Sequence, residues 1–223
     1  MRMLLIGFKY SCNMDSRAPR SARRLTCVLL AAGESRRLGV PKQLVRLRMQ
    51  PLLLHAAKLG SAAVFPQPIV VVLGAHHLRL RAVLRRSGTP ARAVLNPQWR
   101  DGLASSLLAG LAAMPHRTEA ILVLLVDQPH VDARALLRLI AAWRRRPALP
   151  AAALYSGRPG VPAILPRRSW PAVKRLRGDA GARALLRDAA ELTLVPMPEA
   201  AFDLDTPADL AQIGVGLTFQ KGI

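Results

Sequence analysis

The sequence predicts a three-layer α/β/α fold with a mostly parallel, mixed central sheet. Short apolar runs of strand length alternate with longer stretches of helical periodicity, a pattern typical of strands joined by crossover helices. The run EAILVLLVD (119–127) is the most apolar, so we expect it at the centre of the sheet, covered on both faces. The chain has 223 residues, of which 51% are hydrophobic, and this is enough for one domain of that kind.

Strands are expected where apolar, often β-branched runs are bounded by proline, glycine or polar residues. In chain order they cover residues 25–32, 68–74, 91–96, 119–127, 151–155, 160–166 and 192–196. The runs after residue 150 are less regular than those before it.

Helices are expected where apolar residues recur at helical spacing. They cover residues 51–63, 78–86, 102–114, 132–146 and 179–190, and a further helix starts near residue 206. Pro51 can open the first of them because its missing amide proton costs little at the first helical position. Asp132 is placed to cap the fourth, and Thr206, followed by Pro207 and Asp209, is placed to cap the last.

Residues 1–24 are polar and basic without helical or strand periodicity, and we expect a disordered extension that precedes a single domain at 25–223. No apolar run approaches the roughly 20 residues of a membrane-spanning helix, and the start lacks a signal-peptide pattern. We therefore expect a cytoplasmic protein with no membrane partner. With only two cysteines, Cys12 and Cys27, no disulfide framework is expected.

The formal net charge of +20 favours phosphate-rich partners, which include nucleotides, nucleic acid and acidic membrane surfaces. Much of the arginine recurs beside alanine and leucine at helix-surface spacing, as in LRLRAVLRR, which indicates solvated helix faces. Aromatic residues make up 4% of the chain, too few for a platform on which bases stack. Nucleic acid is therefore not the expected partner.

The stretch LLAAGESRRLGVPK (29–42) follows the first predicted strand, at the strand end where such sheets bind ligands. Gly33 and Gly39 let backbone amides approach an anion closely, while Arg37 and Lys42 supply positive charge. The stretch therefore predicts a loop that cradles a triphosphate. It has neither the Gly-Lys-Ser/Thr ending of a Walker loop nor the Gly-x-Gly-x-x-Gly fingerprint of dinucleotide-binding folds.

A second candidate position is Asp127, at the tip of the predicted central strand and followed by Gln128 and Pro129. A carboxylate in this place is well suited to hold Mg²⁺, which takes one or two carboxylates together with phosphate oxygens. The alternative is that Asp127 caps a helix that begins near Val131.

Six segments of the chain resemble, in order, the molybdenum cofactor cytidylyltransferase-like (MobA-like) family of nucleotidyltransferases. They are LAAGESRRLGVPK (30–42), NPQWRDGLASSLLAG (96–110), LVDQP (125–129), GRPGVPAILP (157–166), GDAGAR (178–183) and DLDTPADL (203–210). They span nearly the whole chain after Leu25 and are more similar to the cytidylyltransferase branch than to the guanylyltransferase branch.

The resemblance implies a Rossmann-like nucleotidyltransferase fold and an enzyme that transfers CMP from CTP to the terminal phosphate of molybdopterin, releasing pyrophosphate. CTP and molybdopterin are then the small-molecule substrates and Mg²⁺ is the cofactor. A molybdoenzyme or its maturation chaperone is the implied protein partner. The alternative is a related transferase that uses GTP, or a sugar or alcohol phosphate as acceptor. The remote alternative is a basic nucleic-acid-binding protein without transferase activity.

Carried over by position, the resemblance assigns catalytic roles to Arg37, Lys42 and Asp127. The expected nucleotide-binding residues are Leu30, Ala31, Ala32, Gly33, Ser35, Arg37, Lys42 and Gly74. The expected substrate-binding residues are Ser105, Ser106, Gln128, Pro129, Gly160, Pro162, Asp179 and Arg183. The expected metal ligands are Asp127 and Asp205, with Asp203 as the fallback for the second position.

Some of these residues also have a structural interpretation. Ser105 and Ser106 suit packing near a helix N-terminus as well as contact with an acceptor phosphate. Asp179 can cap a helix, and Arg183 can lie on a solvated helix face. The chain departs from the family's usual pattern at Gln43, where many members have leucine.

Overall fold

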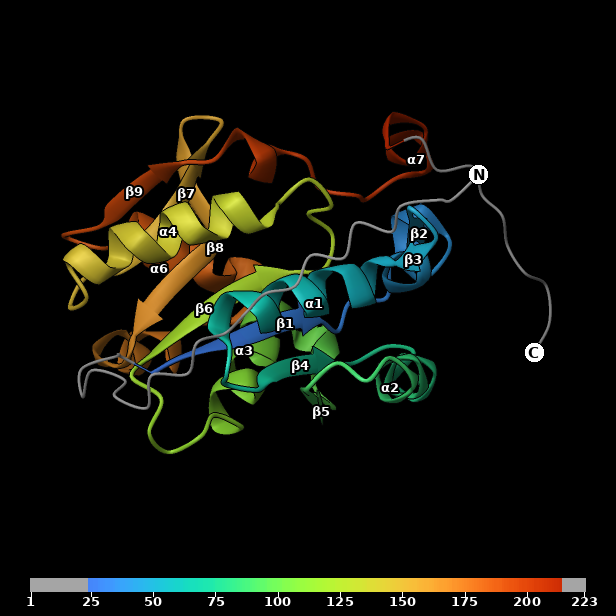
Figure 1. Ribbon diagram of the computed structural model, residues 1–223, viewed down its shortest axis with the longest axis horizontal. Coiled ribbons are helices and arrows are strands. Elements are labelled where there is room, and N and C mark those ends of the chain that lie inside the picture. Colours follow the sequence, from blue (N-terminus) through green and yellow to red (C-terminus); the bar gives the residue numbers. More distant parts are fainter. Residues whose placement is uncertain (1–23, 214–223) are drawn as a thin grey trace, which may run out of the picture.

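The computed structural model describes residues 24–213, so the predicted extension at 1–24 lies outside the described residues except for Arg24. Seven strands form one sheet in the order β5-β4-β1-β6-β8-β7-β9 (Figure 1). They are β1 (Leu25–Ala31), β4 (Ile69–Leu73), β5 (Ala91–Leu95), β6 (Ala120–Leu125), β7 (Ala151–Tyr155), β8 (Arg158–Pro166) and β9 (Thr193–Pro196). The apolar strand β6 lies in the middle, which confirms its predicted place.

The sheet is mixed, as predicted. Strands β5, β4, β1 and β6 run parallel to one another, whereas β8 runs antiparallel to both β6 and β7. Strand β9 pairs parallel with β7 at the far edge. Because β1 and β6 are parallel neighbours in the centre, their carboxyl ends meet at one edge of the sheet.

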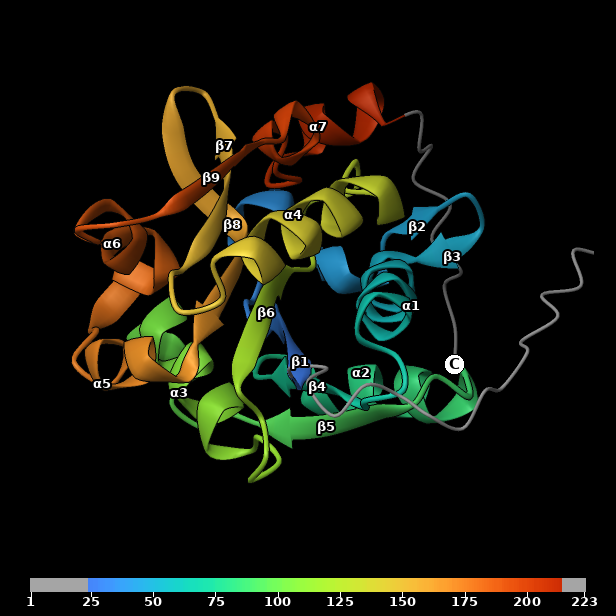
Figure 2. The ribbon, with the colours of Figure 1, turned by 60° about the vertical axis from the view of Figure 1, so that its left-hand side comes forward.

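Helices cover both faces of the sheet (Figure 2). They are α1 (Leu52–Val64), α2 (His77–Arg86), α3 (Leu103–Ala112), α4 (Ala133–Arg145), α5 (Trp170–Val173), α6 (Gly181–Arg187) and α7 (Pro207–Gln212). Buried side chains of α1, α2 and α4 join one hydrophobic core with one face of the sheet, and those of α3, α5 and α6 join a second core with the other. No helix among residues 24–213 has both the length and the apolar character needed to cross a membrane.

The connections contain short turns of 3-10 helix and a small hairpin that the sequence pattern did not predict. The turns are η1 (Arg36–Leu38), η2 (Lys42–Leu44), η3 (Trp99–Asp101), η4 (Arg167–Ser169), η5 (Gly178–Ala180) and η6 (Pro198–Ala201). The hairpin consists of β2 (Arg46–Leu47) and β3 (Gln50–Pro51). Pro51 is therefore not the first helical residue: it has extended backbone and pairs with Arg46, and α1 begins one residue later.

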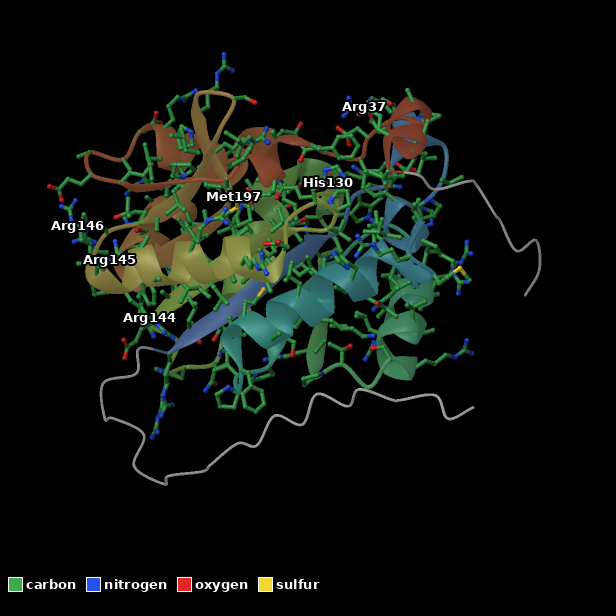
Figure 3. All side chains as sticks on the ribbon, turned by 45° about the horizontal axis from the view of Figure 1, so that its top comes forward. Arg37, His130, Arg144, Arg145, Arg146 and Met197 are labelled. Atoms are coloured by element: carbon green, nitrogen blue, oxygen red, sulfur yellow. The ribbon has the colours of Figure 1, made fainter. Side chains whose placement is uncertain are left out.

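Part of the positive charge lies far from the carboxyl ends of β1 and β6. Arg144, Arg145 and Arg146 cluster at the C-terminal end of α4, well away from Arg37 in the structure (Figure 3). Cations at this end of a helix interact favourably with its dipole. This arrangement agrees with the interpretation of the arginines as solvated helix faces.

The predicted cap of α4 is present, because the Asp132 carboxylate accepts a hydrogen bond of 2.8 Å from the amide of Ala135. Replacing Asp132 with alanine leaves a helix-end amide without this partner, so we expect a loss of about 1 kcal/mol in unfolding free energy. Urea unfolding measures the loss. Asp132→Asn is the matched control and should retain most of the stability, since asparagine caps helices about as well; an equal loss in both variants would contradict the capping role.

Candidate active site

The site lies where the central parallel strands β1 and β6 end. Leu30 pairs with Leu125 in their register, and the amide of Val126 donates to the carbonyl of Leu30. Asp127 follows directly, so the carboxylate emerges beside the loop that leaves β1. This is the edge at which open α/β sheets bind ligands.

Four charged side chains converge at this edge. The Lys42 ammonium donates to the Asp127 carboxylate at 2.9 Å and to Asp205 Oδ1 at 2.5 Å. Arg37 donates to the other oxygen of Asp205 at 2.8 Å, and lies beside α7 (Figure 3). The sequence predicted a function for all four residues, and the structure brings them together although up to 168 positions separate them along the chain.

Lys42 is the enclosed member of the cluster, since its side chain is 11% exposed whereas that of Arg37 is 72% exposed. Burial lowers the pKa of Lys42, but the charges and hydrogen bonds of Asp127 and Asp205 outweigh this and hold the pKa above its ordinary value. Burial likewise raises the pKa of Asp205, but Lys42 and Arg37 lower it more, and the result is a depressed pKa. Lys42 and Asp205 are therefore both charged near neutral pH.

The loop between β1 and Lys42 is held by two polar side chains. The Ser35 hydroxyl accepts a hydrogen bond from the Lys42 amide at 3.0 Å. The amide group of Gln43, fully buried, donates to the carbonyls of Ala31 at 3.1 Å and Gly33 at 2.7 Å. Sequence reasoning noted Gln43 only as a departure from the family pattern, but the structure gives it a clear part in shaping the loop.

We expect Gln43→Leu, a change of similar size, to destabilise the protein by about 1–3 kcal/mol because the carbonyls of Ala31 and Gly33 lose their partner. The measurement is chemical unfolding of the variant against the wild type. Gln67→Leu, at a half-buried position for which no side-chain hydrogen bond is found among the described residues, is the control. If both substitutions had the same small effect, the proposed role of Gln43 would be wrong.

A cavity of about 270 Å³ opens between this loop and α3. One wall consists of residues 30–33 with Lys42, for which nucleotide binding is the prediction, and Asp127, which is predicted to hold the metal. The opposite wall includes Ser106 and Asp179, which the sequence interpretation had placed among the substrate-binding residues. The structure therefore places these two side chains on the same cavity as the loop after β1.

Other predicted site residues make structural contacts. Ser105 donates to the carbonyls of Gln98 and Gly102 and so closes the turn before α3. The Gln128 side chain donates to the carbonyls of Val161 and Ala200, both at 3.0 Å, and ties β8 to η6. These contacts favour the structural interpretation of Ser105 and give Gln128 a similar part.

The remaining predicted residues lie around the site without a polar side-chain contact. Gly74 packs under Trp99 and the carbonyl of Ala32, where a Cβ atom would come within 2.6 Å of both. Pro129, Gly160 and Pro162 are buried. The binding roles assigned to these residues stay predictions.

Asp203 and Arg183 meet beside the charged cluster. Arg183 donates to Asp203 at 3.5 Å and to the Tyr155 hydroxyl at 3.1 Å. Burial raises the pKa of Asp203, and the nearby negative charge of Asp127 raises it further. The expected fallback carboxylate is therefore close to Asp127 but pairs with Arg183 instead of Lys42.

The Asp127 carboxylate has one oxygen that suits a hard cation such as Mg²⁺. The Oδ1 atom of Asp127 is buried and has no hydrogen-bond partner among the described residues, although Oδ2 is bound to Lys42. An unpaired carboxylate oxygen of this kind is a suitable Mg²⁺ ligand. Within residues 24–213, no preformed group of three or more His, Cys, Asp or Glu side chains is arranged to hold a metal, so substrate oxygens or water would complete the coordination.

Comparison with known families identifies the family to which this fold belongs. A family described as "MobA-like NTP transferase domain" matches residues 27–193 of this chain. The chain belongs to this family. The match confirms the predicted resemblance and the nucleotidyltransferase class, and it spans the loop after β1 and Asp127.

Solved structures that match this MobA-like transferase share its fold, and the similar proteins carry different names. "Nicotine blue oxidoreductase" of Paenarthrobacter nicotinovorans is 39% identical over an alignment of 176 residues that covers 73% of this chain and 81% of that protein. The crystal structure of Rv0371c from Mycobacterium tuberculosis H37Rv matches with a TM-score of 0.74 at 28% identity and covers 86% of this chain and 98% of that one. A structure of Rv0371c in complex with manganese matches with a TM-score of 0.68 at 27% identity, over 85% and 97% of the two chains. The predicted fold class is thereby confirmed.

Proposed function

We propose that this MobA-like transferase transfers CMP from CTP to the terminal phosphate of molybdopterin and releases pyrophosphate. The observation that carries the proposal is the convergence of Lys42 and Arg37 on Asp127 and Asp205, beside a cavity at the ligand-binding edge of the sheet. Two cations and two carboxylates in one place suit a reaction in which phosphate charge must be neutralised and a divalent cation held.

Nucleotidyl transfer to an ionised phosphate requires that the reactants be positioned, and it does not require a strong general base. An ionised oxygen of the acceptor phosphate attacks the α-phosphorus of CTP and forms a new P–O bond. The bond from the α-phosphorus to the oxygen that bridges to the β-phosphate breaks, and its electron pair leaves with pyrophosphate. No proton has to be removed from the attacking oxygen, so catalysis rests on in-line orientation and on charge stabilisation.

Lys42 offers a compact charge to the α-phosphate, because its ammonium lies between the two carboxylates at the end of the strands. Arg37 is exposed and is held through Asp205, so its planar guanidinium is free to contact the departing pyrophosphate. The backbone of residues 31–33, fixed by Gln43, would form the cradle for the nucleotide. The resemblance assigned Ser106 and Asp179 to the acceptor, but the cavity wall that they form would lie against the cytidine instead.

Asp127, through its unpaired oxygen, and Asp205 are the residues that would hold Mg²⁺. When bound, the ion supplies positive charge to phosphate oxygens of the nucleotide. Lys42 forms ion pairs with the same two carboxylates in the structure described here, which holds their side chains in place.

The test of base identity is thermal stabilisation by CTP, GTP, ATP and UTP, each with Mg²⁺. A ligand that binds only the native state adds about 2.7 kcal/mol of stability at a hundredfold excess over its dissociation constant. We expect the largest shift with CTP and its loss in Asp127→Ala. Glu191→Ala removes an exposed carboxylate that makes only a 3.8 Å ion pair, and this control should keep the shift. A shift selective for GTP would move the protein to the guanylyltransferase alternative, and no shift with any nucleotide would overturn the proposal.

A second candidate function follows from the relative that is 39% identical and carries the name of an oxidoreductase. A nicotinamide dinucleotide has a pyrophosphate that the loop after β1 could hold in place of a triphosphate. Adding NADPH and NADH to the same thermal series distinguishes the two candidates. Stabilisation by a dinucleotide alone, together with its oxidation in the presence of an organic acceptor dye, would favour the reductase.

A further inference from the structure

A cavity of about 710 Å³ lies between the β7–β8 hairpin and α6, and it shares no lining residue with the cavity at the end of β1. Its volume falls in the range of small-molecule sites, roughly 300–1,000 Å³. The residues that matter for its chemistry are Tyr155, Arg158, Arg183, Arg187 and Asp203. The transfer chemistry proposed above uses none of the three arginines.

The lining of this cavity is strongly positive. Arg158 comes from the hairpin, and Arg183 and Arg187 lie one helical turn apart on α6. Asp203 is the only carboxylate among the lining residues, and it pairs with Arg183. Arg187 pairs with the exposed Asp188 at 3.0 Å, and Arg158 makes no ion pair within residues 24–213. The cavity therefore has positive charge that its own lining does not neutralise.

One of the three guanidiniums is fixed in place. Arg183 donates to the Tyr155 hydroxyl at 3.1 Å, and that hydroxyl donates to the carbonyl of Val161 at 3.1 Å. Tyr155 lies directly over Gly160, where a Cβ atom would come within 2.3 Å of its hydroxyl oxygen. A guanidinium held in this way loses little conformational freedom when it binds an anion.

The cavity adjoins the charged cluster of the active site through Asp203. Asp203 lines the cavity, and the amide of the next residue, Leu204, donates to the carbonyl of Asp127 at 2.8 Å. A molecule in the cavity can therefore reach from the arginines toward Asp127.

We propose that this cavity binds the acceptor and that the acceptor is a phosphomonoester with a second anionic group, which Arg158, Arg183 and Arg187 recognise. The inference rests on the proposed function, because it directs the reacting phosphate of the acceptor toward Asp127 and Lys42. Planar guanidiniums suit phosphate or carboxylate oxygens, which they bind with two parallel hydrogen bonds. The second anionic group of the acceptor thus determines which phosphomonoester is used. This selection is independent of the selection of the nucleotide base.

The test uses α,ω-alkanediol bisphosphates of four to eight carbons and the corresponding alkyl monophosphates as probes, with dissociation constants measured by calorimetry at constant ionic strength. We expect at least one bisphosphate to bind about tenfold or more tightly than its monophosphate, since charge-assisted hydrogen bonds are added. Arg158→Gln and Arg183→Gln should remove most of this preference. Arg168→Gln makes the same change of charge on the exposed turn η4, away from the cavity, and should retain it.

Equal binding of bisphosphates and monophosphates to the wild-type protein would overturn the inference. So would an equal loss in Arg168→Gln, since this would mean a non-specific effect of net charge. Thermal stabilisation by CTP, measured on the same variants, separates this outcome from failure of the proposed function. If CTP stabilises all variants and the bisphosphate preference is missing, only the acceptor inference fails; if the preference exists and no nucleotide binds, only the transferase proposal fails.

Discussion

Lys42→Met is expected to lower the rate of nucleotidyl transfer by on the order of a hundredfold or more, as does the loss of other preorganised charge-stabilising groups. Methionine keeps the length and apolar stem of the side chain but removes the ammonium that binds Asp127 and Asp205. The developing charge at the α-phosphate then has no compact cation beside it. Steady-state kinetics with saturating CTP and acceptor measures the loss.

Lys58→Met is the matched control, since Lys58 is exposed on α1 and the same substitution there should leave the rate within about twofold of wild type. Lys42→Arg tests whether charge alone suffices: the larger planar group cannot reproduce two contacts made by one buried ammonium, so we expect only partial rescue. An Lys42→Met variant as fast as the control would remove Lys42 from the mechanism.

The same substitution changes how stability depends on pH. Asp205 has a depressed pKa in the folded state, so its contribution is present above its ordinary pKa of 3.8 and is lost as pH falls through the depressed value. Lys42 has a raised pKa, so its contribution is present below its ordinary 10.5 and is lost as pH rises through the raised value. At neutral pH both contributions are complete. In Lys42→Met only Arg37 still lowers the pKa of Asp205, so the folded-state value rises toward the ordinary one, and urea unfolding between pH 3 and 7 should show a smaller loss of unfolding free energy on acidification than in the wild type.

Much of the fold was predictable because its elements have local signals. The apolar periodicity of the central strands and the alternation with helices gave the strand and helix positions to within a few residues, and Asp132 caps α4 as predicted. Helix α5, the hairpin of β2 and β3 and the 3-10 turns were missed, because segments of two to four residues carry no period that a sequence window can detect. The antiparallel direction of β8 depends on packing at the far side of the sheet, which local patterns do not specify.

The site was predictable where a motif places a charge at a strand end, as for Lys42 and Asp127. The pairing of Asp205 with Lys42 was not, since 163 positions separate them and only the folded chain brings them together. Gln43 has a structural function that no composition or spacing argument indicates, because its partners are backbone carbonyls of the preceding loop. The resemblance assigned Arg183 to substrate binding, with a solvated helix face as the alternative. Arg158 and Arg187 have no such signal, and only the cavity between the hairpin and α6 suggests a shared role for the three.

Gly102→Ala is expected to damage both stability and nucleotide binding, because the backbone here leaves no room for a side chain. Gly102 has φ 94° and ψ −174°, a conformation that is essentially restricted to glycine and costs other residues about 1–3 kcal/mol. A Cβ atom would also come within 2.4 Å of the backbone of Gly178 and 2.6 Å of the Asp179 carboxylate. The loop with Asp179 must then move, and it forms a wall of the cavity beside the active site.

Gly88→Ala separates these two effects. Gly88 also has a positive φ, 65°, but a Cβ atom there would meet no atom within 4 Å. The control should therefore lose only the cost of the left-handed backbone, about 1–2 kcal/mol, and should bind nucleotide as the wild type does. In Gly102→Ala we expect a larger loss of unfolding free energy in urea and a nucleotide affinity reduced by about tenfold or more, because the displaced loop no longer closes the cavity. Equal effects of the two substitutions on nucleotide binding would mean that the contact between α3 and the Asp179 loop does not shape the site.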